Sequence, residues 1–213
     1  MPIFFQQDIN QHTKLAIWKI EEEEQFFLSH VPLQRSITHA QKRLQHLAGR
    51  YLLKYLFPDF PIELIQIADT RKPFLEDEAY HFSISHCSSY AAVIVSKENR
   101  VGVDIEIPNG KALRILHKFL NDDEKYLVQH NGSQDLSSTI LWSAKEAMFK
   151  WWGLGEVDFS EMLRLNGPLD FKENSMAANF MKAPHNIPYP VNYKIFPEIV
   201  LAWVDTAPII TNK

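Results

Sequence analysis

The spacing of apolar residues changes along this chain, and that change limits the folds that it can adopt. Between Thr38 and Phe57 apolar side chains recur at helical spacing, and Pro58 follows directly, which predicts one helix over this stretch. Between His81 and Ile107 the chain instead holds short runs rich in β-branched residues, which predict strands. We therefore expect a fold that combines helices with β-sheet.

Three strands are expected in the β-rich part, with the sequences HFSIS, YAAVIVS and VGVDIEI. The residues KENR form a turn between the second and the third, and we interpret the group as a hairpin with a neighbouring strand. After a break at Pro108 and Gly110, helical spacing returns in KALRILHKFL and again from Ser138 to Trp152. The tail sequence YKIFPEIVLAWV predicts more strand, with Pro197 at a bulge or between two short strands.

Composition and charge exclude several classes of protein. The mix of apolar and charged residues is ordinary for a globular protein with a sizeable core. The longest apolar runs are broken well before the roughly 18 residues that span a bilayer, so we expect no membrane partner. The net charge of -4 argues against a general nucleic-acid binder. The start MPIFFQQDIN lacks the pattern of an export signal, and Cys87 is the only cysteine, so we expect a cytoplasmic protein.

Two carboxylates share one face of the strand VGVDIEI. Asp104 and Glu106 are two residues apart, so their Cα atoms are expected roughly 6 to 7 Å apart on the same side of the strand. Like charges this close repel unless a cation lies between them, and carboxylate oxygens suit Mg²⁺ or Mn²⁺. The alternative is that both acids lie on the solvated outer face of an edge strand.

A third acid, Glu146, lies in the helical sequence LWSAKEAMFKWWG, whose apolar residues form a stripe that anchors the helix. Lys150 follows four residues later, so both side chains leave the helix on the same side. Glu146 and Lys150 either belong to the same site as Asp104 and Glu106 or form a surface ion pair worth a few tenths of a kcal/mol. Lys145 falls near the apolar stripe, where a lysine usually extends its ammonium toward solvent, and its role stays open.

Polar and basic residues elsewhere suit a phosphate ligand. Ser85 and His86 end the strand FSISH, but adjacent strand residues diverge, so they make a poor pair of nucleophile and base. They can instead hold a phosphate, unless the histidine is only structural. A basic stripe on the first long helix is either solvated or matched to a polyanionic ligand. Its members are Arg43, His46, Arg50 and Lys54.

The order of these clusters resembles the 4′-phosphopantetheinyl transferase superfamily, and specifically its two-lobed, surfactin-synthetase-type branch. The resemblance spans Arg50 to Lys150 and is strongest in GVDIE, residues 102–106, and in WxxKEAxxK, residues 142–150. It implies an α+β fold of two similar α/β lobes related by a pseudo-twofold axis. Each lobe would be an antiparallel sheet packed against a long helix, with coenzyme A in the cleft between them. We expect the N-terminal lobe over residues 1–108 and the C-terminal lobe over residues 109–213.

The resemblance also implies the roles of individual residues. Asp104, Glu106 and Glu146 would bind the metal, Mg²⁺ or Mn²⁺, that grips the pyrophosphate of coenzyme A. Glu146, or a metal-bound water that it orients, would accept the serine proton, and Lys150 would neutralise the pyrophosphate and assist the leaving phosphate. Further contacts to coenzyme A would come from Arg50, Lys72, Pro73, Ser85 and His86.

Some positions align less clearly with the superfamily. Arg43 is the alternative to Arg50 on the first helix, and Glu124 matches an acid that lies beside the superfamily's metal site. Ser83 stands where the superfamily has asparagine and Arg71 where glycine is common, but neither change removes a proposed ligand.

The activity implied is transfer of 4′-phosphopantetheine from coenzyme A to a serine of an apo acyl or peptidyl carrier protein, with release of 3′,5′-ADP. Such carriers serve fatty acid, polyketide and nonribosomal peptide biosynthesis, and we expect the enzyme to be a monomer. Two alternatives stay open. One is a metal-dependent phosphohydrolase acting on a nucleotide or phosphoester, and the other is a non-catalytic module that binds carrier proteins.

Overall fold

The structure is a computed structural model that describes residues 3–171 and 174–207. It divides into two compact units, one containing residues 3–101 and 205–207 and the other Gly102–Val204. The strand β7, Arg100–Glu106, contains the first junction between them. The lobe boundary expected after residue 108 stays a prediction.

The first unit is built on a four-stranded sheet with the strand order β1-β2-β6-β5. Each neighbouring pair in this sheet is antiparallel, and β5 and β6 form a hairpin. The pairing expected across the turn KENR is wrong, because β6 and β7 belong to different sheets. Two short antiparallel strands, β3 and β4, form a separate small sheet. The strands of this unit are β1 (Ile3–Asp8), β2 (Thr13–Lys19), β3 (Gln66–Ile67), β4 (Pro73–Phe74), β5 (His81–Cys87) and β6 (Tyr90–Ser96).

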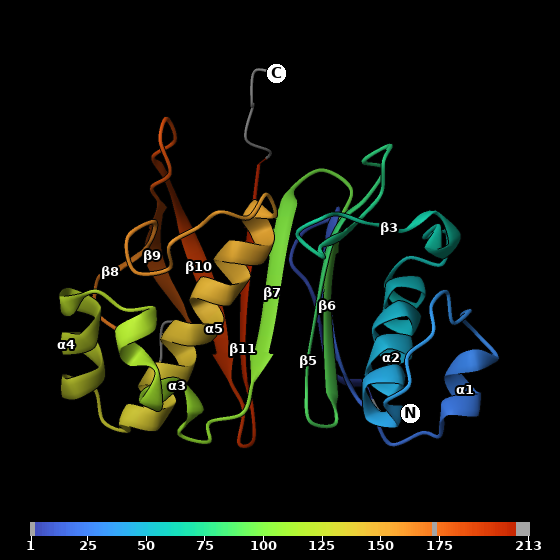
Figure 1. Cartoon of the computed structure of the whole chain (residues 1–213), viewed down its shortest axis with the longest axis horizontal. Coiled ribbons are helices and arrows are strands. Elements are labelled where there is room, and N and C mark those ends of the chain that lie inside the picture. The colour runs from blue at the N-terminus through green and yellow to red at the C-terminus, as the bar shows by residue number, and fades with distance from the viewer. Residues whose placement is uncertain (1–2, 172–173, 208–213) are drawn as a thin grey trace. The chain divides into compact units, whose positions relative to one another are not determined.

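The predicted helix of the first unit is confirmed as α2, Ala40–Leu56, which lies along one face of the four-stranded sheet (Figure 1). Its apolar side chains, among them Leu47 and Leu52, are buried in one core with Val93 and Val95 of β6. The helix ends before Pro58 because the residue before a proline disfavours helical dihedrals, and Phe57 is extended. The short helix α1, Glu24–Leu28, and the 3₁₀ turn η1, Ile62–Leu64, complete the unit.

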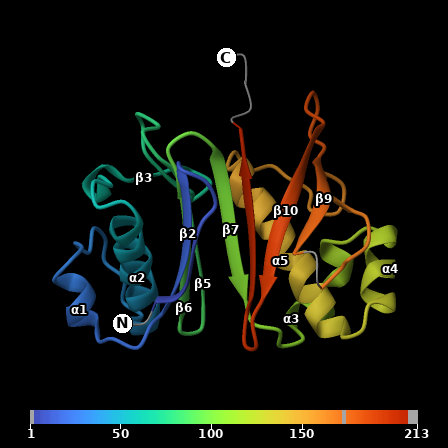
Figure 2. The same ribbon diagram turned by 180° about the vertical axis from the view of Figure 1, so that it is seen from behind.

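The second unit contains a five-stranded sheet with the order β7-β11-β10-β9-β8. Figure 2 shows β10 and β11 in front of the long helix α5, Gln134–Trp152, which packs on the other face of this sheet. Pro197 lies between β10 and β11, so the second of the two alternatives for the tail is confirmed. The remaining elements are α3 (Lys111–Arg114), η2 (Leu116–Lys118), α4 (Asp122–His130), β8 (Leu163–Asn166), β9 (Ser175–Phe180), β10 (Ile187–Ile195) and β11 (Val200–Thr206).

The third expected strand, β7, forms but does not join the hairpin of β5 and β6. It lies at the edge of the second sheet beside β11 instead. Val101, Val103 and Ile105 are buried, and so are Gly102 and Asp104 between them. α5 covers the face of β7 that carries Gly102, and β11 pairs with β7 along its edge.

The fold confirms the expected mixture of helices with antiparallel sheets, whereas the pseudo-twofold relation of the lobes stays a prediction. Sequence patterns did not reveal β1, β2, β8 or β9. Over residues 3–171 and 174–207, no helix has the length and apolar character needed to cross a membrane.

Candidate functional site

The strand β7 approaches the backbone of α5 very closely at Gly102. A Cβ atom at this position would lie 2.0 Å from the carbonyl oxygen of Ala147 and 2.6 Å from the backbone nitrogen of Trp151. Only glycine leaves room for this approach. Because strand side chains alternate, Asp104 leaves β7 on the same side as Gly102 and therefore faces α5.

Asp104 is bound at both carboxylate oxygens by residues of α5. Ser143 Oγ donates a hydrogen bond to Asp104 Oδ2 at 2.9 Å, and Lys150 Nζ contacts Asp104 Oδ1 at 2.7 Å. Asp104 is only 4% exposed, so the alternative of a solvated strand face is wrong for this residue. Lys150 thus pairs with Asp104 across two elements. Sequence reasoning missed Ser143, although it lies one helical turn before Glu146 on α5.

Glu106 and Glu146 lie partly buried in the electrostatic field of Asp104. Burial raises the pKa of Glu146 to about 7, and the negative charges of Asp104 and Glu106 act in the same direction. Burial also raises the pKa of Glu106, again together with the charge of Asp104. Lys150 and Lys111 lower both pKa values. The three carboxylates therefore share one neighbourhood in which their negative charges repel.

The chemistry of this group fits a divalent cation, although its arrangement is that of an ion-paired state. Asp104, Glu106 and Glu146 offer hard oxygen donors, and a cation among them would relieve their repulsion. Across residues 3–171 and 174–207, however, no three acidic, histidine or cysteine side chains are grouped so that they could hold a metal as they stand. Lys150 instead occupies one oxygen of Asp104. The predicted ligand set therefore stays a proposal.

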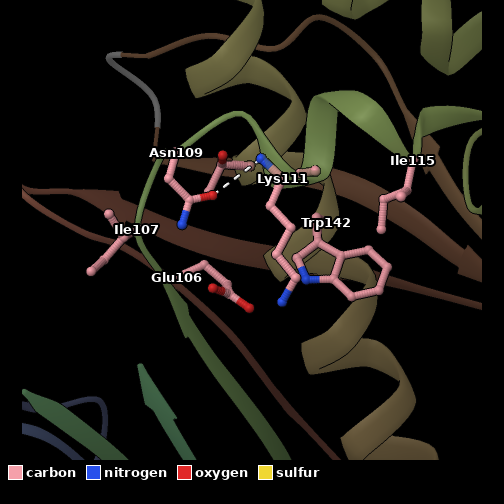
Figure 3. Close-up of a pocket in the computed structure, with 8 residues that line it drawn as sticks. Glu106, Ile107, Asn109, Lys111, Ile115 and Trp142 are labelled. Carbon is pink, nitrogen blue, oxygen red and sulfur yellow. Dashed lines mark hydrogen bonds between the residues drawn. The ribbon is translucent and has the colours of Figure 1, made fainter. Parts of the chain in front are cut away.

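A pocket opens beside Glu106, with about 250 Å³ of empty space that includes open solvent. It is lined by the end of β7, by α3 and by α5, and Figure 3 shows the side chain of Lys111 extending toward Glu106. Trp142 contributes an aromatic wall, and a hydrogen bond from its side chain lowers the pKa of Glu106. Glu106 is therefore accessible from a hollow that is part apolar and part charged.

Lys145 does not reach solvent, so the expectation for its ammonium is wrong. It is 0% exposed, and its Nζ contacts Glu124 Oε2 at 2.6 Å. The same nitrogen donates to the backbone carbonyls of Phe119 and Phe159 at 2.7 and 2.8 Å. Burial lowers the pKa of Lys145 to about 8, an effect that the charge of Glu124 opposes. Because its partners satisfy this lysine inside the unit, it has no need to extend outward.

Glu124 connects this ion pair to the rest of the second unit. Its Oε2 accepts a hydrogen bond from the backbone of Asn121, and Asn121 caps the start of α4 in return. Its Oε1 accepts from the backbone nitrogen of Leu165 in β8 at 2.9 Å. The pair of Glu124 and Lys145 thereby fixes α5 against α4 and β8, next to the residue Glu146.

Of the two basic residues considered on α2, Arg50 is the better suited to an anion. Arg43 is engaged, because its Nε contacts Glu24 Oε1 at 2.7 Å and its Nη1 donates to the carbonyl of Ile37 at 2.8 Å. Arg50 is 6% exposed, and its Nε has no hydrogen-bond partner among the described residues. Burial lowers the pKa of Arg50 to about 10, and the charge of Arg35 adds to this effect. A buried guanidinium with an unsatisfied N–H is well prepared for a phosphate oxygen.

His46 belongs to the same basic stripe on α2. Its Nε2 is buried and lacks a hydrogen-bond partner within the described part of the chain. Burial lowers the pKa of His46 to about 4, and the charges of Arg50, Arg35 and His86 lower it further. Two buried nitrogens without a hydrogen-bond partner in the described structure therefore lie one turn apart on α2, with His86 of β5 nearby.

The other predicted residues of the first unit lie on two elements. Ser85 is buried and His86 is exposed, so adjacent residues of β5 point in opposite directions as expected. Pro73 begins β4, and Lys72 precedes it. Burial lowers the pKa of Lys72 to about 8, together with the charge of Arg100. Lys72 therefore has Arg100 as its cationic neighbour, whereas His86 acts on the group around Arg50.

Residues 100–194 match the family model described as the 4′-phosphopantetheinyl transferase superfamily. This part of the chain is similar to that superfamily. The superfamily segment contains β7 and α5, and with them Asp104, Glu106, Glu146 and Lys150. Arg50, Lys72, Pro73, Ser85 and His86 lie before it.

Relatives with a common name extend the similarity beyond the superfamily segment. Enterobactin synthase component D of Salmonella austin is 31% identical over 159 residues, which cover 74% of this chain and 64% of that protein. The Salmonella typhi protein of the same name is 32% identical over 133 residues, covering 61% and 56%. That of Escherichia coli O157:H7 is 30% identical over 126 residues, covering 56% and 60%. The matched residues thus span about three-fifths of the length of these relatives.

Proposed function

We propose that this chain transfers 4′-phosphopantetheine from coenzyme A to a serine of an apo acyl or peptidyl carrier protein and releases 3′,5′-ADP. The observation that carries the proposal is the cluster of three carboxylates and one lysine on β7 and α5, inside the superfamily segment. The name of the relatives, a component of enterobactin synthase, supports a carrier that belongs to a biosynthetic synthase. The surfactin-synthetase-type branch, the cytoplasmic location and the monomeric state remain predictions.

The proposal includes a divalent cation, Mg²⁺ or Mn²⁺, bound by Asp104, Glu106 and Glu146. Bound there, such a cation supplies positive charge to the pyrophosphate oxygens of coenzyme A. Burial raises the pKa values of Glu106 and Glu146, and the negative charge of Asp104 adds to the effect. This repulsion supports the ligand set, because a cation favours the ionised form of each acid.

The protein's own residues position the substrate and move the proton. The serine oxygen of the carrier attacks the phosphorus that bears the pantetheine arm, and the bond from that phosphorus to 3′,5′-ADP breaks. Glu146, or a water that it orients, is proposed to accept the serine proton. Lys150 lies one turn further along α5 and supplies an ammonium to the leaving phosphate. No nucleophile of the enzyme is needed.

Residues of the first unit are proposed to bind the remaining parts of coenzyme A. Arg50, Ser85 and His86 would contact its phosphates, and Lys72 and Pro73 would line the adenine site. The unsatisfied Nε of the buried Arg50 supports this role, because a phosphate oxygen would complete its hydrogen bonding.

Intact mass spectrometry tests the activity directly. The pure protein is incubated with coenzyme A, Mg²⁺ and an apo carrier protein, and the carrier should gain the mass of one phosphopantetheine unless a chelator is present. Glu146→Gln and Lys150→Ala should lose this activity while remaining folded. Asp123→Asn, a change at an exposed acid on α4, should retain it.

Two outcomes would replace the proposal. Release of phosphopantetheine without a carrier would identify a hydrolase, and carrier binding without any gain of mass would identify a non-catalytic module.

A further inference from the structure

The two contacts of Asp104 differ in how readily they can change. Ser143 is 0% exposed, and its short side chain holds Oδ2 from inside the unit. Lys150 reaches Oδ1 with a long, flexible side chain that is 25% exposed. One oxygen of Asp104 is therefore held firmly, whereas the contact at the other can be given up by rotation of a lysine toward solvent.

Lys150 occupies the position that a cation bound to Asp104 would need. Its ammonium lies 2.7 Å from Oδ1, and a divalent cation would bind the same oxygen. Two positive groups at one oxygen repel strongly at such short distances. The described acids are also not yet grouped as a metal site, so cation binding requires a rearrangement around Asp104.

We propose that Lys150 is an exchangeable placeholder for the divalent cation. Its ammonium neutralises Asp104 until the cation binds, and the cation then displaces it toward the substrate phosphate while Ser143 keeps Asp104 in place. The proposal rests on the cation site of the proposed function. It adds that Lys150 becomes available to the substrate only when the cation is present. Lys150 thereby couples binding of the cation to its own contact with the substrate phosphate.

Binding of Mn²⁺ to the protein without coenzyme A, measured by electron paramagnetic resonance, tests this exchange. Lys150→Met keeps the length of the side chain but removes the competing ammonium. Because an ion pair of this kind is worth about 0.2 to 1 kcal/mol, the affinity for Mn²⁺ should rise by about 1.4- to 5-fold.

The matched control is Lys111→Met. Lys111 also acts on Glu106 and Glu146 through its charge, but the contact with Asp104 Oδ1 belongs to Lys150. The control should therefore change the affinity less than Lys150→Met does. An unchanged or weaker affinity in Lys150→Met, or an equal gain in Lys111→Met, would overturn the placeholder role.

A second measurement uses the wild-type protein and does not depend on how a variant folds. Reductive methylation followed by peptide mass spectrometry reports how accessible each lysine amine is. Mn²⁺ alone should increase the labelling of Lys150 and leave that of the fully buried Lys145 unchanged. Constant or decreased labelling of Lys150 at saturating Mn²⁺ would contradict the exchange.

Asp104→Asn separates failure of this inference from failure of the proposed function. If this variant binds Mn²⁺ at least about tenfold more weakly than the wild type, the cation site stands, and an unchanged Lys150→Met refutes the placeholder alone. If Asp104→Asn binds Mn²⁺ as tightly as the wild type, the proposed cation site is refuted, and with it the placeholder role of Lys150.

Discussion

Replacing Gly102 with alanine should separate β7 from α5 and damage the acid cluster at a distance. The added methyl would lie 2.0 Å from the carbonyl oxygen of Ala147 and 2.6 Å from the nitrogen of Trp151. Both atoms belong to the backbone of a helix, so neither can rotate away as the end of a side chain would. Relief requires β7 and α5 to move apart by more than about 1 Å, since carbon contacts are favourable only near 3.5 to 4.0 Å.

The expected cost lies at the upper end of the range for overpacked cores, about 3 kcal/mol. For a chain of this size that loss lowers the melting temperature by roughly 6 to 12 °C, at about 2 to 4 °C for each kcal/mol. The same movement lengthens the contacts of Asp104 with Ser143 and Lys150, which are now 2.9 and 2.7 Å. Misplacement of about 1 Å in a catalytic group can cost about a hundredfold in rate, so phosphopantetheine transfer should fall by that order.

Thermal unfolding followed by circular dichroism, together with the transfer assay, measures both effects. Gly49→Ala in α2 is the matched control, because its Cβ would meet only side-chain atoms of Ile84, Cγ2 at 2.8 Å and Cδ1 at 3.8 Å. That side chain can shift, and alanine is a better helix former than glycine. A melting temperature of Gly102→Ala within about 2 °C of the wild type, with full activity, would refute the argument from close approach.

Three further predictions concern buried charges. Lys145→Met leaves Glu124 charged and buried without its partner, so urea unfolding should show a loss of about 3 to 5 kcal/mol, and a loss below 1 kcal/mol would contradict the role of the pair. Burial lowers the pKa of His46 to about 4 in the folded state, from 6.5 in the unfolded state. Between these pH values the unfolded state binds more protons. The stability that neutral His46 contributes above pH 6.5 is therefore lost as the pH falls toward 4. The variant His46→Gln should show a flatter fall over that window in denaturant titrations, and an equally steep fall would exclude His46 as the cause. Arg50→Gln should raise the KM for coenzyme A at least about tenfold, and Arg43→Gln should not. Of these two arginines, Arg50 has the buried N–H left for a phosphate. Equal effects of both variants in steady-state kinetics would reject Arg50 as the phosphate ligand.

Local patterns were sufficient where a single element determines the answer. The period of apolar residues located α2 to within a few residues, because burial of one helix face follows directly from that period. The alternation along β7 also placed Asp104 and Glu106 on one face, and Gly102 explains why that face meets a helix.

Features that depend on a partner distant in the sequence were missed or misjudged. The alternation within β7 contains no information on which strand lies beside it, so its place next to β11 was not foreseen. The burial of the Lys145 ammonium depends on Glu124 and on two backbone carbonyls from other segments. Ser143 resembles any small residue of a buried helix until Asp104 is placed beside it.

The adjacent residues Lys145 and Glu146 lie on different sides of α5. Consecutive residues of a helix point about 100° apart, so Lys145 can be anchored in the interior while Glu146 stays among the acids. A deletion of one residue earlier in the helix would turn the carboxylate of Glu146 into the place of Lys145, toward Glu124. An insertion of one residue would instead turn the ammonium of Lys145 into the place of Glu146, toward Asp104. The length of α5 before this dipeptide is therefore constrained as strictly as the identity of either residue.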